Sequence, residues 1–193
     1  MKFARTAIAA ALGLAFCGAA FAQAGTIQRD VNQQQRIEQG LKSGQLTTRE
    51  AARLENEQAR IERDQARAMQ DGKLTPAEKA RLAREQDRAS RDIYREKHDA
   101  QTGNPNSASS QRMQADVQRN ANQQARIEQG VKSGSLTTRE AAKLERGQAR
   151  DSRLEARAGA DGNVSPREQR RIQKSENRES RKIRREKHDA QTQ

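Results

Sequence analysis

Acidic side chains at two glycine-containing turns have the spacing most suggestive of chemistry. The segments DGKLTPAE and DGNVSPRE each carry an aspartate directly before the glycine and a glutamate six residues after it. Carboxylates at both ends of a tight turn can supply oxygen ligands to a hard cation such as Ca²⁺. The candidate metal ligands are therefore Asp71, Glu78, Asp161 and Glu168.

The first of these turns resembles the second half of the calcium-binding loop of the EF-hand family. The fifth, sixth, eighth, ninth and twelfth loop places hold Asp71, Gly72, Leu74, Thr75 and Glu78. The resemblance implies calcium binding, yet the first and third places, where the family has oxygen ligands, hold Arg67 and Met69. An arginine at the first place repels the cation. Metal binding at these turns is thus the alternative interpretation. The preferred one is a structural turn with no cofactor.

A shared pattern explains the turns without a metal. SGQLTTRE, DGKLTPAE, SGSLTTRE and DGNVSPRE all have the form Gly-x-apolar-Thr/Ser-x-x-Glu. A glycine can end a helix in the left-handed conformation. A Thr or Ser followed three residues later by Glu, as in Thr47 with Glu50 and Thr75 with Glu78, forms a capping box at the start of the next helix. We therefore predict four capped corners between helices.

The LTTRE and LTPAE segments are also similar to the LTxxQ motifs of small periplasmic stress chaperones. That resemblance implies an exported, all-helical protein that holds unfolded clients on a basic surface without ATP. The chain has Glu50 and Glu78 where the motif has glutamine, and it has four copies of the turn instead of two. An ATP-independent periplasmic stress chaperone is therefore a further alternative.

An internal repeat organises the chain. NQQQRIEQGLKSGQLTTREAARLENEQAR begins at Asn32 and returns as NQQARIEQGVKSGSLTTREAAKLERGQAR at Asn122, 90 positions later. Between the copies, residues 101–112 are rich in Gly, Asn, Pro and Ser, which is typical of a flexible linker. We predict an all-α fold of two tandem homologous modules, residues 27–100 and 113–190, each a helical hairpin or a bundle of about three helices. In the first module the helices are expected at about 27–42, 48–70 and 76–99.

The predicted core is thin. In residues 23–193, Leu, Ile, Val and Phe make up about one residue in nine, a share that favours disorder. The abundant Ala, Gln, Glu, Arg and Lys favour helices instead. Glutamines such as Gln58 and Gln65 occupy positions on the core-facing sides of the helices. The large apolar residues there are Ile27, Val31, Ile37, Leu41, Leu54, Ile61, Met69, Leu82 and Ile93, with Leu46 and Leu74 at the corners. We expect loosely packed or coiled-coil-like helices, and a homo-oligomer is left open.

The N-terminal segment has the pattern of a secretory signal. Two basic residues precede an apolar run that ends in Ala-Phe-Ala at 20–22, a small-x-small cleavage pattern. The run is shorter than the roughly 20 apolar residues of a membrane span. We expect a signal peptide at residues 1–22, a mature chain from near Gln23, and a periplasmic location. Acylation at Cys17 is the alternative.

Little in the sequence points to catalysis. The only cysteine lies in the expected signal peptide, and the two histidines are His98 and His188. Glu96, His98 and Asp99 could attract a metal ion. However, Glu96 and His98 are two positions apart and face different sides of a helix, so another chain would have to complete the site. The sequence predicts a protein that is not an enzyme.

Basic charge is the strongest functional indication. The formal net charge is +12, and the last helical stretch, residues 167–189, has ten Lys or Arg against five Asp or Glu. Its densest group is Arg181, Lys182, Arg184, Arg185 and Lys187. Such a group favours an anionic envelope component or a client protein as partner. Nucleic acid is not expected, because export removes the chain from it and the mature chain keeps only one aromatic side chain, Tyr94, that could stack on bases. The alternative is a solvated helix held by ion pairs along its surface.

Overall fold

The structure, a computed structural model, describes residues 13–189, with side chains from Gln23 onward. Within this range it has six helices and no strand, which confirms the predicted all-α class. They are α1 (Gly13–Ser43), α2 (Thr48–Ala68), α3 (Pro76–Lys97), α4 (Ala108–Lys132), α5 (Thr138–Ala158) and α6 (Pro166–Glu186).

The four predicted corners are confirmed. The backbone φ angles at Gly44, Gly72, Gly134 and Gly162 lie between 74° and 92°, in the left-handed region where a side chain is strained. The next helix begins in each case with a complete capping box. These corners satisfy backbone N–H groups that a helix start leaves unpaired, and they turn the chain back on itself.

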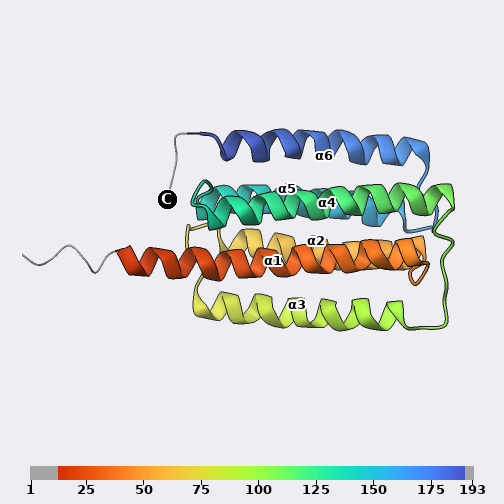
Figure 1. Cartoon of the computed structure of the whole chain (residues 1–193), viewed down its shortest axis with the longest axis horizontal. Coiled ribbons are helices and arrows are strands. Elements are labelled where there is room, and N and C mark those ends of the chain that lie inside the picture. The colour runs from red at the N-terminus through yellow and green to blue at the C-terminus, as the bar shows by residue number, and fades with distance from the viewer. Residues whose placement is uncertain (1–12, 190–193) are drawn as a thin grey trace, which may run out of the picture.

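The two repeats pack face to face as a layered bundle (Figure 1). The largest helix–helix contacts join α2 to α5 and α1 to α4, and α3 and α6 lie at the two outer edges. The start of each inner helix meets the end of its partner. Arg49 at the start of α2 donates to the carbonyl oxygen of Asp161 after α5 (2.9 Å), and Arg139 donates to that of Asp71 after α2 (3.3 Å). The paired helices α2 and α5 are therefore antiparallel.

Two helix boundaries differ from the prediction. Helix α1 begins at Gly13 instead of residue 27, so it runs through the predicted cleavage point. The whole predicted signal peptide, residues 1–22, lies outside the residues with described side chains. Helix α4 begins at Ala108, because the Ser107 side chain accepts a hydrogen bond from the Ser110 N–H and caps it. The predicted linker of 101–112 is thus five residues too long at its C-terminal end.

The connection before α4 is held against the first corner. The Gly103 N–H donates to the Gly44 carbonyl oxygen at 2.8 Å. A Cβ atom at Gly103 would collide with the carbonyl oxygen of Leu46, so only glycine fits this approach. The segment that the sequence presents as a flexible linker is therefore docked to the bundle in the structure.

Apolar side chains form two clusters, each containing residues from both repeats. The first gathers near the start of α2 and includes Ile37, Leu41, Leu46, Leu54, Ile93, Met113, Val117, Val164 and Ile172. The second gathers near the start of α5 and includes Ile27, Ile127, Val131, Leu136, Leu144 and Ile183. Leu74 is half-buried, whereas its counterpart Val164 is fully buried, so the predicted corner role of Leu74 is only partly met.

Carboxyl groups are buried between the repeats. Glu55 and Glu62 of α2 and Glu145 and Glu155 of α5 are each 0% exposed, and we refer to these four residues as the polar seam. Gln124 of α4 bridges the two repeats by donating to Glu62 Oε1 (3.1 Å) and Glu145 Oε2 (3.2 Å). Glutamines at core positions therefore serve as hydrogen-bond donors to buried carboxyls.

The other carboxyls of the seam are also hydrogen-bonded. Gln34 donates to Glu55 (3.0 Å), Asn120 donates to Glu155 (2.8 Å), and Ser152 donates to Glu62 (2.9 Å). None of the four glutamates forms an ion pair with a lysine or arginine in residues 23–189. Burial without a cation disfavours the charged form.

The pKa values of the seam follow from this burial. Burial raises the pKa of Glu55 to about 8. It also raises the pKa values of Glu62, Glu145 and Glu155 well above the usual range, and negative charge on neighbouring carboxylates adds to the effect. These groups are therefore protonated in the folded protein at mildly acidic pH.

The seam predicts that the folded state loses stability as pH rises. Unfolded glutamates titrate at a pKa of about 4.3, so between that pH and the raised folded values the folded state binds more protons than the unfolded state. The protonated glutamates of the seam therefore contribute their full stabilisation below about pH 4, and this contribution falls as the pH rises. One pKa unit is worth about 1.4 kcal/mol, which corresponds to a melting-temperature change of about 3–6 °C in a chain of this size. We expect a melting temperature at least about 5 °C lower at pH 8 than at pH 5.

The variant Glu62→Gln provides the control, because a neutral amide can still bond to Ser152 and Gln124. It is expected to raise the melting temperature at pH 8 and to change it little at pH 5. A wild-type melting temperature that rises between pH 5 and pH 8 would contradict the assignment.

Candidate anion-binding and cation-binding sites

The predicted metal ligands of the turns have structural hydrogen bonds: Glu78 and Glu168 complete capping boxes, and Asp71 and Asp161 accept a backbone hydrogen bond within the turn. Glu78 Oε2 accepts hydrogen bonds from the Thr75 N–H (2.9 Å) and hydroxyl (2.6 Å). Asp71 Oδ1 accepts from the Lys73 N–H (2.9 Å). Asp161 and Glu168 repeat these contacts in the second half. None of the four belongs to the acidic clusters found among the described residues, so the structure does not bring them together as a metal site.

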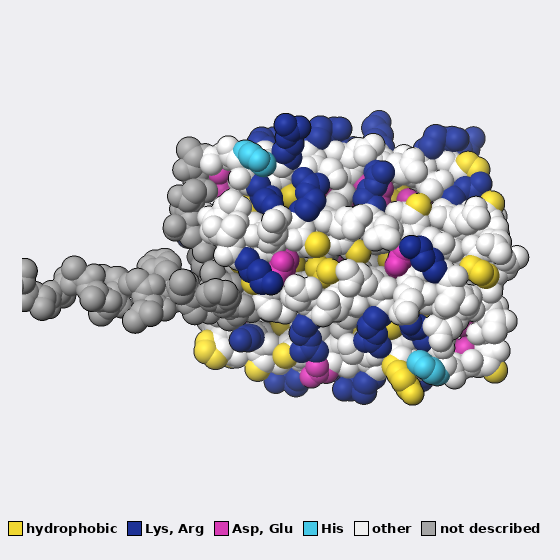
Figure 2. Space-filling view, viewed as in Figure 1, with side chains coloured by type: hydrophobic (Ala, Val, Ile, Leu, Met, Phe, Trp, Pro, Cys, Tyr) yellow, Lys and Arg dark blue, Asp and Glu magenta, His cyan; other side chains and the backbone are white. Residues whose placement is uncertain are grey.

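The predicted basic group divides between two environments. Arg181, Arg184 and Arg185 line a shallow hollow of about 580 Å³ on α6, with His188 and Asp189. We refer to these three arginines as the α6 basic patch. Figure 2 shows Lys and Arg side chains along this edge of the bundle. Lys182 instead pairs with Glu179 (3.0 Å), and Lys187 donates to Gln129 (3.2 Å), so both lysines are held against the protein.

A second basic surface lies between α2 and α5. It is a groove of about 470 Å³ with exposed arginines on both sides and alanines between them. We name it the arginine groove. Its lining residues are Arg49, Ala52, Arg53, Asn56, Arg153, Ala156, Arg157 and Ala160. The lining contains four guanidinium groups and no acidic side chain, which is an arrangement suited to an anion.

The four arginines of the groove are electrostatically available. None of them forms an ion pair with an acidic side chain in the described part of the chain. The repeat supplies a natural contrast at the opposite end of α2, where Asp64 pairs with Arg67 (3.4 Å) and Arg81 (3.4 Å). The residue equivalent to Asp64 in the second repeat is Leu154, which packs against the apolar core. The arginines of the groove therefore keep their positive charge, whereas Asp64 partly neutralises the arginines at the equivalent end of α2.

Two acidic clusters occupy equivalent corners of the bundle. Glu50, Glu96 and Asp99 form the first triad, and Glu140, Glu186 and Asp189 form the second triad, with one oxygen of each residue within 4.8 Å of the others. The sequence interpretation looked to another chain for a further ligand at Glu96, whereas Glu50 of the same chain lies beside Glu96 and Asp99. His98 is not part of it. Its ring stacks on Tyr94, and its Nδ1 lies 2.7 Å from the Tyr94 carbonyl oxygen.

Sequence reasoning missed the arginine groove and the position of Glu50 in the first triad. The groove joins residues about 100 positions apart, and only the antiparallel pairing of α2 with α5 brings them together. One signal was present in the sequence: the repeats differ at Asp64 and Leu154 among otherwise similar arginines.

Comparisons with protein-family models, with curated proteins and with solved structures find no match for this chain. A search of the described helices finds none that is both long and apolar enough to cross a membrane.

The capping role of the turns can be tested at Thr75. Loss of an N-cap side chain costs about 1 kcal/mol, so Thr75→Ala is expected to lower the melting temperature by about 2–4 °C. Thr102→Ala, at an exposed position of the connection before α4, is the control and should leave it unchanged. Thermal melts in EDTA and in calcium distinguish a helix-capping turn from a calcium-binding turn. If Thr75→Ala removes a calcium-dependent stabilisation instead of lowering stability in EDTA, the turn is a metal site.

Proposed function

We propose that this protein is an exported, periplasmic, non-enzymatic helical repeat protein that binds an anionic component of the cell envelope through its basic surfaces. The arginine groove carries the proposal. It concentrates four guanidinium groups without a compensating carboxylate, and the α6 basic patch provides a second attachment surface.

The chemistry of the groove favours phosphate-bearing head groups. A guanidinium group can donate two parallel hydrogen bonds to one phosphate. The arginines stand along two antiparallel helices, so they can contact several phosphates spread over a surface. A phosphate surface presents many such groups at once, which suits two separate basic patches on one molecule.

The chaperone alternative has less support from the surface. In residues 23–189 the only exposed large hydrophobic side chain is Tyr94, at 61% exposed. A holdase that captures unfolded clients needs apolar contact area. The basic surfaces therefore favour an anionic partner over an unfolded apolar one.

Binding should depend on the groove. The test is co-sedimentation with vesicles of phosphatidylglycerol and phosphatidylcholine, compared with vesicles of phosphatidylcholine alone. Each basic residue near an anionic surface contributes about 1 kcal/mol, so the double variant Arg153→Gln/Arg157→Gln should bind roughly 30-fold more weakly. Binding by the wild-type chain should also weaken between about 50 mM and about 300 mM salt, because added ions screen the attraction.

The repeat offers a matched control. Arg63→Gln/Arg67→Gln removes the same charge at the equivalent positions, where Asp64 already pairs with Arg67. We expect this variant to lose much less affinity. Equal losses in both variants would show that net charge alone governs binding, and the groove would then have no special role. Salt-resistant binding to an acidic protein, without vesicle binding, would favour a protein partner.

The α6 basic patch makes a separate contribution. Arg181→Gln/Arg184→Gln is expected to weaken vesicle binding further when combined with the groove variant, because the two surfaces lie on different helices. The comparison of single and combined variants in the same sedimentation assay checks this. If the combined variant binds no more weakly than the groove variant, α6 is a solvated helix and takes no part.

A further inference from the structure

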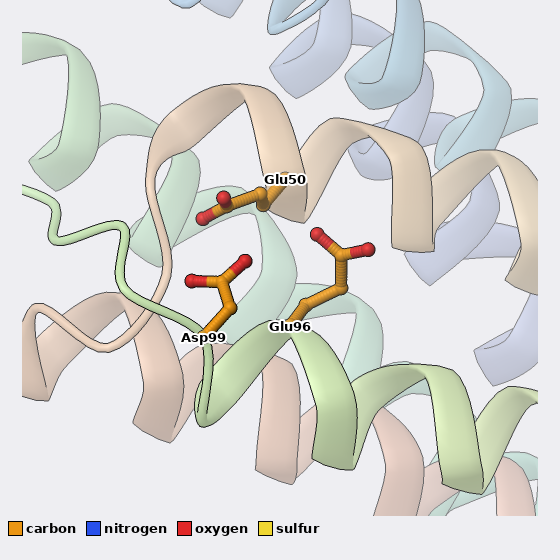
Figure 3. A group of neighbouring side chains, drawn as sticks. All are labelled: Glu50, Glu96 and Asp99. Carbon is orange, nitrogen blue, oxygen red and sulfur yellow. The ribbon is translucent and has the colours of Figure 1, made fainter.

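We propose that the first triad, Glu50, Glu96 and Asp99, is a binding site for a divalent cation, with calcium as the best fit. Figure 3 shows the three carboxylates converging at the corner where the start of α2 meets the end of α3. One oxygen of each lies within 4.8 Å of the others. This site is independent of the proposed anion binding, and it uses Glu50 of the first corner but none of the earlier candidate ligands Asp71, Glu78, Asp161 and Glu168.

A buried oxygen of Glu50 points to a missing ligand. Glu50 is 1% exposed, and one of its carboxylate oxygens lies within 4.8 Å of an oxygen of Glu96 and of Asp99. Its Oε2 accepts the capping hydrogen bond from the Thr47 N–H at 2.8 Å. Its Oε1 is buried and has no hydrogen-bond partner. A buried carboxylate oxygen without a donor is costly, and a bound cation would satisfy it.

The surroundings of the first triad leave its negative charge uncompensated. No lysine or arginine in residues 23–189 forms an ion pair with Glu50, Glu96 or Asp99. Asp99 accepts a hydrogen bond from the Gln101 N–H (2.8 Å), which orients its carboxylate.

The second triad is a weaker version of the same site. Glu140 is also 1% exposed with an unpartnered Oε1. However, Glu186 has the Lys143 ammonium at 4.0 Å and the Arg185 guanidinium at 3.4 Å. Two basic groups already compensate this carboxylate and repel a metal ion. We therefore expect the first triad to bind a cation more tightly than the second.

The ligand set favours one class of ion. All three ligands are carboxylates, which suit hard cations and not the softer zinc or copper. Calcium accepts about 6–8 oxygen ligands in flexible geometry, whereas magnesium demands a near-ideal octahedron and gives up its waters reluctantly. A site built from three protein carboxylates, with one oxygen of each within 4.8 Å of the others, therefore favours calcium, and water can complete its shell.

Tyr94 permits a test that reads only the first triad. It is the only tyrosine of the chain, there is no tryptophan, and it lies two residues before Glu96 in α3. The equivalent residue beside the second triad is Arg184. Tb³⁺ occupies calcium sites and emits when a nearby tyrosine absorbs light. Titration of the EDTA-treated full chain with Tb³⁺ should give tyrosine-sensitised emission that calcium displaces.

Variants decide the assignment. Glu96→Gln, at a half-buried side chain without a hydrogen-bond partner, should weaken Tb³⁺ binding at least about tenfold by removing one charged ligand, while circular dichroism stays unchanged. Glu186→Gln is the matched control and should leave the Tb³⁺ titration unchanged.

Calorimetry with calcium should give two binding sites, and the weaker site should be lost in Glu186→Gln. The proposal is overturned if Glu96→Gln binds Tb³⁺ normally, if Asp71→Asn removes the emission instead, or if neither ion binds below about 10 mM.

Discussion

Burial of carboxyl groups between the repeats is the constraint on which the rest of the structure depends. A charged glutamate cannot be moved from water to an uncharged interior without a large free-energy cost. Glu55, Glu62, Glu145 and Glu155 are nevertheless fully buried where α2 meets α5. They tolerate this position because side chains on neighbouring helices donate hydrogen bonds to them and because they hold their protons. The helices are therefore fixed in the register that aligns donors with carboxyls.

That register also determines what the outer surface can present. Hydrogen bonds such as Ser152 to Glu62 are directional, so α2 and α5 cannot slide past one another without leaving buried polar groups unpaired. With the helices held in this alignment, Arg49 and Arg53 stand across from Arg153 and Arg157. A core of leucines alone would have allowed several registers. The polar seam thus specifies the position of the arginine groove.

Local signals predicted the corners well and the pairing of the repeats poorly. A glycine followed by Thr or Ser and then Glu determines its own geometry, because every atom of the cap lies within a few residues. The buried glutamines and glutamates carry no such local signature. The helical pattern placed Gln58 on a core-facing side, but in sequence Glu62 is indistinguishable from a surface residue of a charged helix. Glu50 was predicted as a cap, but its second oxygen matters only because α3 ends beside it, and no pattern in the sequence reports that contact.

The seam also affects the charge that a partner meets. The formal net charge of +12 counts every glutamate as negative. Each carboxyl that remains protonated in the interior removes one negative charge from that count, so the folded protein at neutral pH is more basic than its composition indicates. About half of the acidic side chains are buried, while all four arginines of the groove stay exposed. Folding therefore separates charge in this molecule, because it buries carboxyl groups and leaves the arginines of the groove on the surface.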